Sequence, residues 1–455
     1  MLPDDVLLAI FDFYLVRVSD HNKDTEAWQL LVHVCRRWRC VVFGSPRRLN
    51  LRLICPLRTP VRESLDVWPA LPLIVTGAAP ADNIVVALGH SDRVCQINLW
   101  EVQGGLEWDK VLVAMQVPFP ALTGLLLCCR QGMDISIIPD TFLGGSAPRL
   151  QYLTLDRIPF PGIPNLLLSA THLVDLCLLQ IPHSGYVSPE ALATCLSVLT
   201  GLDTLSLSLS IGFPYSRSRQ RPPPISRFIL PGLTTFRFDG VSKYLDDLVA
   251  RIDAPRLHEL SITFPLDQMN FDAPHLVQFI SRTPRFREPN EAHVTLDFYA
   301  KVNLFWASDD RARLFVEIIY DDIEVDPEPS SISSIAQVCT MCLPPLPTVE
   351  NLRLGIFTKD LYSDLNWKEN VENNQWLKLL RPFPSVKSLY LSEELQPDMA
   401  SALQELVGDR TTEVLPFLQN IFLARFEQSG SFQEAIGQFV AARRLSGHPL
   451  VVLPL

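Results

Sequence analysis

The residues whose types could support chemistry are cysteines and histidines, and they occur without the partners that such chemistry needs. Cys339-x-x-Cys342 is the only Cys-x-x-Cys pair of the chain, whereas a closed structural zinc site needs four ligands. His258-Glu259 begins the stretch HELSI, which lacks the second histidine of a zinc-protease helix. We therefore expect no metal site and no cofactor.

The sequence also lacks the motifs of nucleophilic catalysis and of phosphate binding. The chain contains no Gly-x-Ser-x-Gly elbow, no Gly-Lys-Ser/Thr phosphate loop and no Gly-x-Gly-x-x-Gly turn. Cys128 and Cys129 fall on a predicted strand, where adjacent side chains point to opposite faces, so joint ligation of one ion is not expected. The sequence predicts a protein that is not an enzyme.

Composition and charge restrict the partners. The chain has 455 residues, of which 47% are hydrophobic, and its net charge at pH 7 is −11. Because duplex binding depends on neutralising phosphates with Lys and Arg, an acidic chain is a poor partner for nucleic acid. Residues 1–62 nevertheless carry an excess of basic side chains, and the remainder carries the acidic excess. We expect no nucleic-acid partner.

Several features predict an intracellular protein without a membrane span. The start MLPDDVLL has two aspartates where a secretion signal carries positive charge. The ten cysteines lie mostly among apolar residues, as free thiols do in a reducing compartment. The longest apolar run, residues 112–129, is interrupted by Pro118 and Pro120, which favours two short strands over a membrane helix.

A short apolar pattern returns along most of the chain and predicts its fold. An apolar residue, two variable residues, an apolar one, a variable one and a third apolar one recur in eight copies. The copies are PRLQYLTL, THLVDLCL, TGLDTLSL, PGLTTFRF, PRLHELSI, PTVENLRL, PSVKSLYL and PFLQNIFL. The steps between the first five are close to the 20–29 residues typical of leucine-rich repeats, or somewhat longer. Each copy is one strand that can bury its apolar side only by stacking on its neighbours.

The pattern therefore predicts an α/β solenoid, an irregular leucine-rich-repeat-like horseshoe with helical return segments. SPEALATCLSVL fits a return helix with Ser188 as N-cap, and SFQEAIGQFVAARRL is a helix that could cap the array. The Asn or Cys that seals the turn of regular repeats is replaced by Ile158, Ile181 and Val241, so irregular curvature is expected. Loop insertions are expected near residues 216–227 and 320–331, the first basic and proline-rich, the second acidic.

The first fifty residues differ from the repeats. Apolar residues recur at three- and four-residue steps on both sides of the polar stretch 19–26, which predicts two amphipathic helices joined by a loop. LPDDVLLAIFDFYL, this loop and WQLLVHVCRRWRCVVFGSPRRLNL together resemble the F-box in order, spacing and residue type. The match rests on Leu2-Pro3, the Ile10-Phe11 pair and the Val34-Cys35-Arg36-x-Trp38 core.

The resemblance implies a three-helix unit that docks on a Skp-family adaptor and, through it, on a cullin scaffold. It also implies an F-box over residues 1–50, which leaves 51–93 as a connecting segment and 94–455 as the solenoid. The loop Arg17–Ala27 is longer than the usual connection. Some of the positions carried over to the adaptor contact are expected to pack internally instead. These positions are Leu2, Pro3, Val6, Leu7, Ile10, Phe11, Leu31, Val34, Cys35 and Trp38.

An F-box followed by imperfect leucine-rich repeats resembles the fungal F-box families, in which the repeats are taken to select the substrate. Tyr and Arg are favoured anchors at interfaces, so five outward positions of the predicted strands are candidate target-binding residues: Tyr152, Arg237, His258, Arg353 and Tyr390. The predicted function is substrate recognition for a Skp–cullin–F-box ubiquitin ligase, with an unknown target protein. Two alternatives stay open. One is a scaffold or decoy that binds the adaptor without ubiquitin transfer, and the other is a repeat-domain enzyme or receptor that binds no adaptor.

Overall fold

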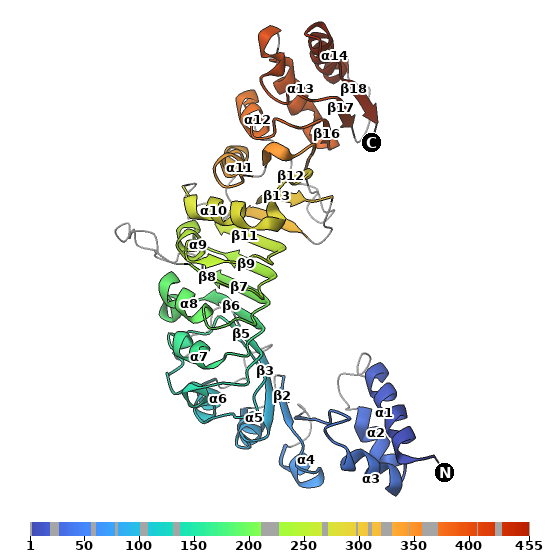
Figure 1. The fold of residues 1–455 in the computed structure, drawn as a ribbon, viewed down its shortest axis with the longest axis vertical. Coiled ribbons are helices and arrows are strands. Elements are labelled where there is room, and N and C mark those ends of the chain that lie inside the picture. Colours follow the sequence, from blue (N-terminus) through green and yellow to red (C-terminus); the bar gives the residue numbers. More distant parts are fainter. Residues whose placement is uncertain are drawn as a thin grey trace. The chain divides into compact units, whose positions relative to one another are not determined.

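The chain divides into two compact units, residues 1–202 and 203–455, here called the N-terminal and the C-terminal unit. Figure 1 shows the elements of both units in a computed structural model. The described residues are 2–18, 27–55, 61–77, 81–100, 108–130, 137–210, 227–265, 272–296, 299–307, 312–319, 330–344, 346–356, 372–406, 408–423 and 430–454.

The N-terminal unit begins with three helices that pack against one another, α1 (Asp4–Val18), α2 (Ala27–Val34) and α3 (Arg36–Gly44). Asp4 and Asp5 lie in the first turn of α1, where their charge suits the helix dipole. Cys35 is the N-cap of α3, and its sulfur accepts a hydrogen bond from the backbone N–H of Trp38. Most of the long loop expected between the first two helices, residues 19–26, lies outside the described residues.

Parallel strands follow, joined by return helices as parallel pairing requires. The strands lie side by side in sequence order: β1 (Leu53–Cys55), β2 (Leu73–Thr76), β3 (Val94–Trp100), β4 (Gly124–Cys128), β5 (Tyr152–Asp156) and β6 (Asp175–Ile181). The helices of this part are α4 (Val61–Val67), α5 (Ala81–Leu88), α6 (Trp108–Ala114), α7 (Ile163–Ser169) and α8 (Pro189–Leu196), with 3₁₀ turns η1 (Phe142–Gly145) and η2 (His183–Gly185).

This order corrects one sequence expectation. The segment 51–93 was expected to connect the F-box to the solenoid, but it contributes strands β1 and β2 to the sheet. The sheet therefore begins at Leu53 and not at residue 94. Each of these strands buries only two side chains, such as Leu73 and Val75 in β2. Strands so short do not display the full repeat pattern, which is why the sequence concealed them.

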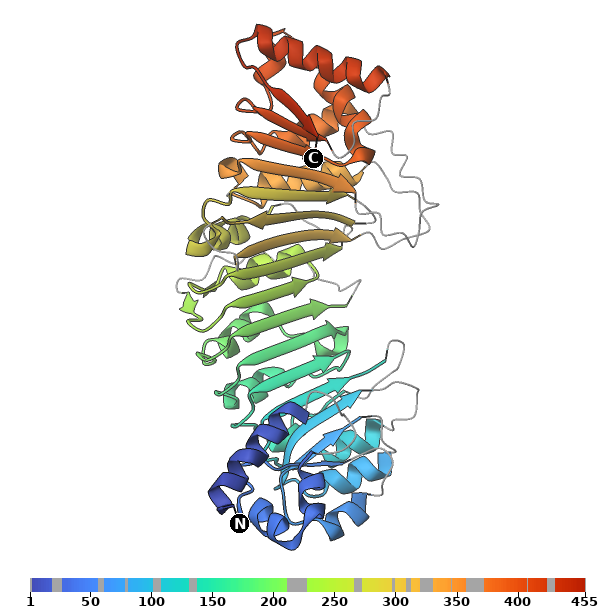
Figure 2. The same cartoon turned by 90° about the vertical axis from the view of Figure 1, so that its right-hand side faces the viewer.

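The sheet of the C-terminal unit is mostly parallel but contains an antiparallel insertion. Its strand order is β7-β9-β11-β14-β13-β12-β15-β16-β17-β18, and β13 runs antiparallel to both β12 and β14. The bounds are β7 (Thr204–Leu209), β9 (Thr235–Asp239), β11 (Glu259–Pro265), β12 (Glu291–Leu296), β13 (Tyr299–Phe305), β14 (Arg313–Ile319), β15 (Asn351–Ile356), β16 (Ser388–Leu391), β17 (Asn420–Leu423) and β18 (Val451–Pro454). A separate pair joins β8 (Phe228–Ile229) to β10 (Ile252–Asp253). Figure 2 looks onto these strands.

Return helices cover one side of this sheet, as Figure 1 shows for α9–α12. They are α9 (Ser242–Val249), α10 (Pro274–Arg282), α11 (Ser330–Met341), α12 (Asn373–Leu380), α13 (Gln396–Gln404) and α14 (Gly430–Leu445). The 3₁₀ turns are η4 (Pro284–Phe286), η5 (Leu346–Thr348), η6 (Glu393–Leu395) and η7 (Gly408–Thr412). The other side, away from the helices, is called the open face.

The repeat pattern is confirmed at every copy. All eight motifs form the predicted strands, and each of their three apolar residues is at most 2% exposed. Burying a Leu or Phe side chain stabilises the fold by about 1.5–3 kcal/mol, so these positions supply much of the core. Ser188 also caps α8 as predicted, because its hydroxyl accepts a hydrogen bond from the N–H of Ala191 at 3.2 Å. The architecture is a solenoid-like α/β fold.

Three details differ from the expectation or fall outside it. The helix expected to cap the array, α14, is followed by β18, which pairs parallel with β17 and is the last described strand. The strands β12 to β14 were not foreseen. Most of the two expected insertions, residues 216–226 and 320–329, lies outside the described residues.

Candidate interaction surfaces

The ten residues assigned to adaptor contact separate into core and surface on α1–α3. Leu7, Phe11 and Leu31 are at most 5% exposed and belong to the internal packing of the helices. Trp38 is half-buried, and the centroid of its ring lies 4.8 Å from that of Phe11. The other six are exposed at the surface: Leu2, Pro3, Val6, Ile10, Val34 and Cys35.

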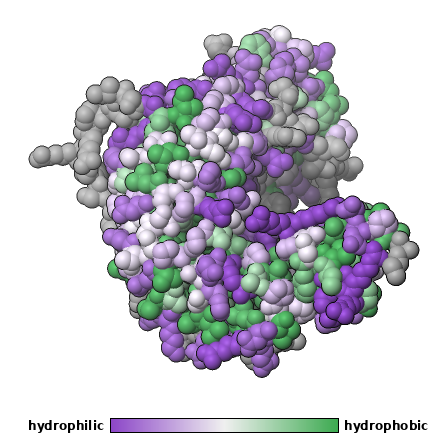
Figure 3. Space-filling view, turned by 60° about the horizontal axis from the view of Figure 1, so that its bottom comes forward, coloured by the Kyte–Doolittle hydropathy of each residue, from purple (hydrophilic) through white to green (hydrophobic). Residues whose placement is uncertain are grey.

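Exposed apolar side chains gather on the first two helices. On α1 and the residues before it they follow at steps of four, four and three residues, which places them on one helix face. On α2 two such residues lie four positions apart. We call these six side chains the N-terminal apolar set: Leu2, Val6, Ile10, Phe13, Leu30 and Val34, each 42–62% exposed. Figure 3 brings this end of the N-terminal unit forward and shows apolar patches between hydrophilic ones.

Phe13 and Leu30 are the two members of this set that the sequence analysis did not assign to a contact. Their spacing from Ile10 and Val34 is the signal that could have found them, because i, i+3 and i, i+4 neighbours share a helix face. The F-box resemblance placed no weight on either residue, and apolar periodicity alone does not tell a buried helix face from an exposed one.

Arginines from the basic stretch after Cys35 brace the three helices. Arg37 Nη2 lies 2.7 Å from Asp4 Oδ1 and also donates to the carbonyl of Leu2, which ties α3 to the start of α1. Arg39 Nε donates to the carbonyl of Val32 at 3.0 Å. These contacts fix the helix that presents Val6 and Ile10.

An aromatic cluster joins these helices to the first return helix. The rings of Trp28 and Trp68 meet edge to face with centroids 5.1 Å apart, and His33 and Phe43 also pack against Trp68. Trp28 is only 2% exposed, and its indole N–H donates to the carbonyl of Arg52 at 2.8 Å. Residues on both sides of position 50 therefore share one core. Helices α1–α3 pack directly against the segment that follows them and do not form a separate domain joined by a linker.

The open face of the C-terminal unit carries a row of stacked aromatic and charged side chains. Arg353, Tyr390 and Phe422 are register partners on β15, β16 and β17. The guanidinium of Arg353 lies 4.3 Å from the centre of the Tyr390 ring, and the rings of Tyr390 and Phe422 stack at 4.5 Å and 7°. Such stacks contribute beyond simple burial, so the row is a rigid feature of this face.

The row continues onto the antiparallel insertion. Arg353 Nε and His293 Nε2 each lie 2.6 Å from Glu291 Oε1, and the ring of His293 packs on Phe305 at 4.5 Å. Burial raises the pKa of Glu291, but the hydrogen bonds and charges of His293 and Arg353 outweigh it and hold that pKa below its usual value. We call the six residues the open-face row: Phe305, His293, Glu291, Arg353, Tyr390 and Phe422.

Two of the five candidate target-binding residues touch one another. Arg353 and Tyr390 are in contact, whereas Arg237 lies five strands away on β9 of the same sheet and pairs with Glu259 at 2.8 Å. His258 precedes β11 and is only partly exposed. Tyr152 is 50% exposed on β5 and belongs to the N-terminal unit. The sequence analysis missed the remaining members of the row, most of which come from the unforeseen insertion.

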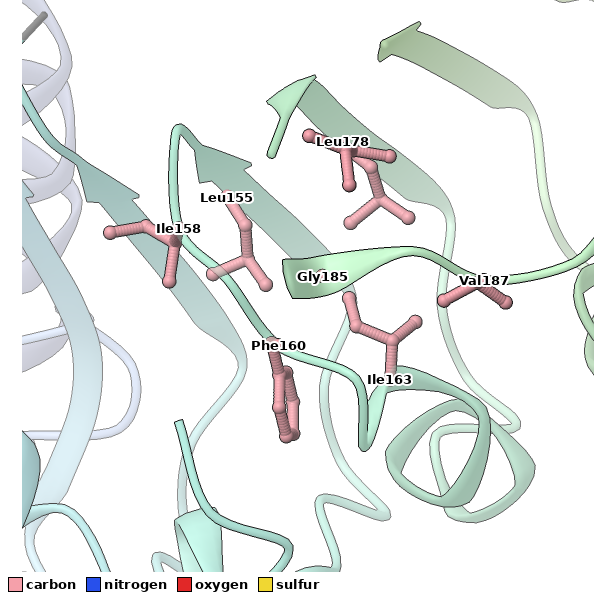
Figure 4. Close-up of a pocket in the computed structure, with 8 residues that line it drawn as sticks. Leu155, Ile158, Phe160, Ile163, Leu178, Gly185 and Val187 are labelled. Carbon is pink, nitrogen blue, oxygen red and sulfur yellow. The ribbon is translucent and has the colours of Figure 1, made fainter. Parts of the chain in front are cut away.

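One small cavity lies in the N-terminal unit. Figure 4 shows it, with Ile158 on its wall. Its volume is about 10 Å³, and both Ile158 and Ile181, which stand where regular repeats have Asn or Cys, line it. Its lining is apolar, so a buried water would find few partners there. The full lining is Leu155, Ile158, Phe160, Ile163, Leu178, Ile181, Gly185 and Val187. Apolar packing is thus found at the positions where regular repeats have Asn or Cys.

A wider groove of about 520 Å³ lies on the helix side of the C-terminal unit, between α11, the segment after it and the end of α12. Cys339 lines it and Cys342 lies buried nearby. Burial raises the pKa of both thiols, that of Cys342 to about 12. At neutral pH both thiols are protonated and pack as small apolar groups.

Comparisons with known proteins add little to this picture. No family profile and no curated protein matches the chain. Among solved structures, the leucine-rich repeat-containing protein LegL7 from Legionella pneumophila is similar at 14% identity and a TM-score of 0.29, over 88% of this chain and 99% of its own. A likeness at that level carries no argument. No helix of the described part is long and apolar enough to cross a membrane. The strand register and the buried repeat positions show a solenoid-like α/β fold with a mostly parallel sheet.

Proposed function

We propose that the protein is the substrate-recognition subunit of a Skp–cullin–F-box ubiquitin ligase and works inside the cell. The observation that carries the proposal is the N-terminal apolar set. Val6, Ile10 and Val34 occupy positions of the F-box resemblance, and each is more than 40% exposed although it is apolar. Exposed apolar residues that share a helix face favour a protein contact.

The internal packing supports the same interpretation. Phe11 and Trp38 hold the helices together, and Arg37 ties α3 to α1. A docking surface on a braced helix pair needs little reorganisation on binding, which favours affinity. In this proposal the adaptor covers the N-terminal apolar set, and a cullin is recruited through the adaptor.

The repeats have the second role. The open-face row offers aromatic and arginine side chains of the kind that dominate protein interfaces, and we assign target capture to this face. The protein then has no chemistry of its own. It raises the effective concentration of the target beside the ubiquitin-charged enzyme, because tethering turns an encounter between two molecules into an intramolecular one.

Affinity purification of the intact protein beside a Val6→Glu, Val34→Glu variant tests the proposal. Co-purification of a Skp-type adaptor and a cullin with the intact protein alone supports ligase recruitment. Adaptor without cullin favours the scaffold or decoy, and capture of neither overturns the F-box assignment. Val113→Glu is the matched control, since Val113 on α6 is also exposed, at 65%.

A further inference from the structure

Two ion pairs lie on the open face of the C-terminal unit. Arg237 is 59% exposed, whereas its partner Glu259 is 29% exposed. Arg353 is 45% exposed and its partner Glu291 is 25% exposed. In both pairs the guanidinium side chain is the more exposed partner and is accessible to an approaching molecule.

Two further cations lie between these pairs. Arg313 is exposed at the start of β14, and it is the register partner of Glu259 on β11. Lys301 on β13 lies with its Nζ 4.3 Å from the centre of the Phe315 ring and is the register partner of Glu317 on β14. Arg237, Arg313, Lys301 and Arg353 thus follow one another across β9, β14, β13 and β15.

We infer that the open face of the C-terminal unit binds an extended acidic segment of a partner protein. The inference rests on the proposed function, since it names the chemistry of the captured target. The seven strand spacings from Arg237 to Phe422 amount to about 34 Å, which an extended segment of about ten residues spans. Glutamate or aspartate side chains of that segment pair with the four cations, and its apolar side chains lie on Tyr390 and Phe422.

Nucleic acid is the other class of anionic ligand that could stack on the aromatic rings of this face. The distribution of charge favours an acidic peptide over it. Each arginine of the two pairs is partly neutralised by the carboxylate with which it pairs, and the net charge of the whole chain is −11. A polyphosphate needs a dense, unneutralised set of cations to release its counterions. A peptide with a few carboxylates requires only local complementarity, which steers encounter and selects the partner.

Fluorescence polarisation with the full-length protein tests this inference without adaptor or cullin. The probes are a labelled ten-residue peptide with glutamate at positions 1, 3, 5 and 7 and leucine at position 9, all on one face of the extended chain, the same peptide with lysine for glutamate, and a single-stranded oligonucleotide. We expect only the acidic peptide to bind, and its affinity to fall as NaCl is raised from 50 to 500 mM, because salt screens exposed charges.

The control variant is matched in charge and in exposure. Arg353→Ala and Arg237→Ala should each weaken acidic-peptide binding about five-fold, the effect of losing one exposed charge pair. Arg381→Ala should leave it unchanged, since Arg381 is 54% exposed and pairs with Glu413 on another part of the unit. Equal binding of the acidic and basic peptides, equal loss in Arg381→Ala, or tighter binding of the oligonucleotide overturns the inference. If the protein binds the adaptor but not the acidic peptide, the inference is overturned and the proposed function still stands.

Discussion

Tyr390 and Phe422 stack face to face on adjacent strands, with ring centroids 4.5 Å apart and an interplanar angle of 7°. The two rings come from consecutive repeats and occupy outward positions of the paired strands β16 and β17. Their contact shows that the open face has a defined structure of its own and is more than the solvated side of a sheet.

The stack predicts an energetic coupling between the two rings. In a double-mutant cycle, Tyr390→Ala and Phe422→Ala should together cost about 1 kcal/mol less than the sum of the single changes, because the stacking term is lost only once. Urea unfolding of the four proteins measures this. Strict additivity would mean that the rings do not stabilise one another.

Glu291 predicts a pH dependence of the open-face row. Its pKa is lowered in the folded protein, so the ionised carboxylate stabilises the fold above the pKa of an ordinary glutamate, and this contribution is lost as the pH falls through the folded value. Glu291→Gln removes the titrating group and keeps its shape. We expect the stability difference between the two proteins to be largest near pH 6 and to shrink towards pH 3, as followed by thermal unfolding. A difference that stays constant over this range would contradict the lowered pKa.

Trp68 predicts that the N-terminal helices and the first repeat fold as one core. Trp68→Ala removes the ring that packs on Trp28, His33 and Phe43 and should cost about 2 kcal/mol. Val67→Ala is the control, because Val67 is 72% exposed and its truncation should change stability by less than about 0.5 kcal/mol. If both variants unfold at the same urea concentration, the aromatic cluster is not a core.

We expect the buried Arg443 side chain to stabilise the last repeat. The side chain is fully buried and donates to the carbonyls of Thr411, Pro416 and Leu418, which joins α14 to the loops before β17. Arg443→Ala leaves these acceptors unpaired and should cost about 3 kcal/mol. Limited proteolysis should then cut the C-terminal repeat sooner, whereas the exposed neighbour Arg444, changed to Ala, should leave the cleavage rate unaltered.

The repeat strands were predictable because their pattern has a simple physical cause. Leu153 and Leu155 must both face the core of a strand that stacks on its neighbours, and the same holds in every copy. The meander β12 to β14 was not predictable in this way. Its strands alternate with period two, as in Val294 and Leu296, but they lack the spacing that ties a strand to a repeat, so nothing in the sequence placed them within the array.

The candidate surfaces were predictable only in part. The F-box resemblance pointed to the helices that carry Val6 and Val34, yet it could not tell these exposed residues from the buried Phe11 and Leu31. Likewise, outward positions such as Arg353 and Tyr390 were visible in the pattern. Their contact depends on the strand register, and the part of the row on His293 and Glu291 depends on an insertion that brings distant segments together.

The central claim is that the N-terminal apolar set binds a Skp-type adaptor. Isothermal titration of the purified protein with purified adaptor tests it most directly, beside the Val6→Glu, Val34→Glu variant and the Val113→Glu control. The account predicts that the intact protein and the control bind alike and that the double variant loses at least about 100-fold in affinity, as expected when charges are buried at an apolar interface. No binding by the intact protein, or equal binding by the double variant, would contradict it.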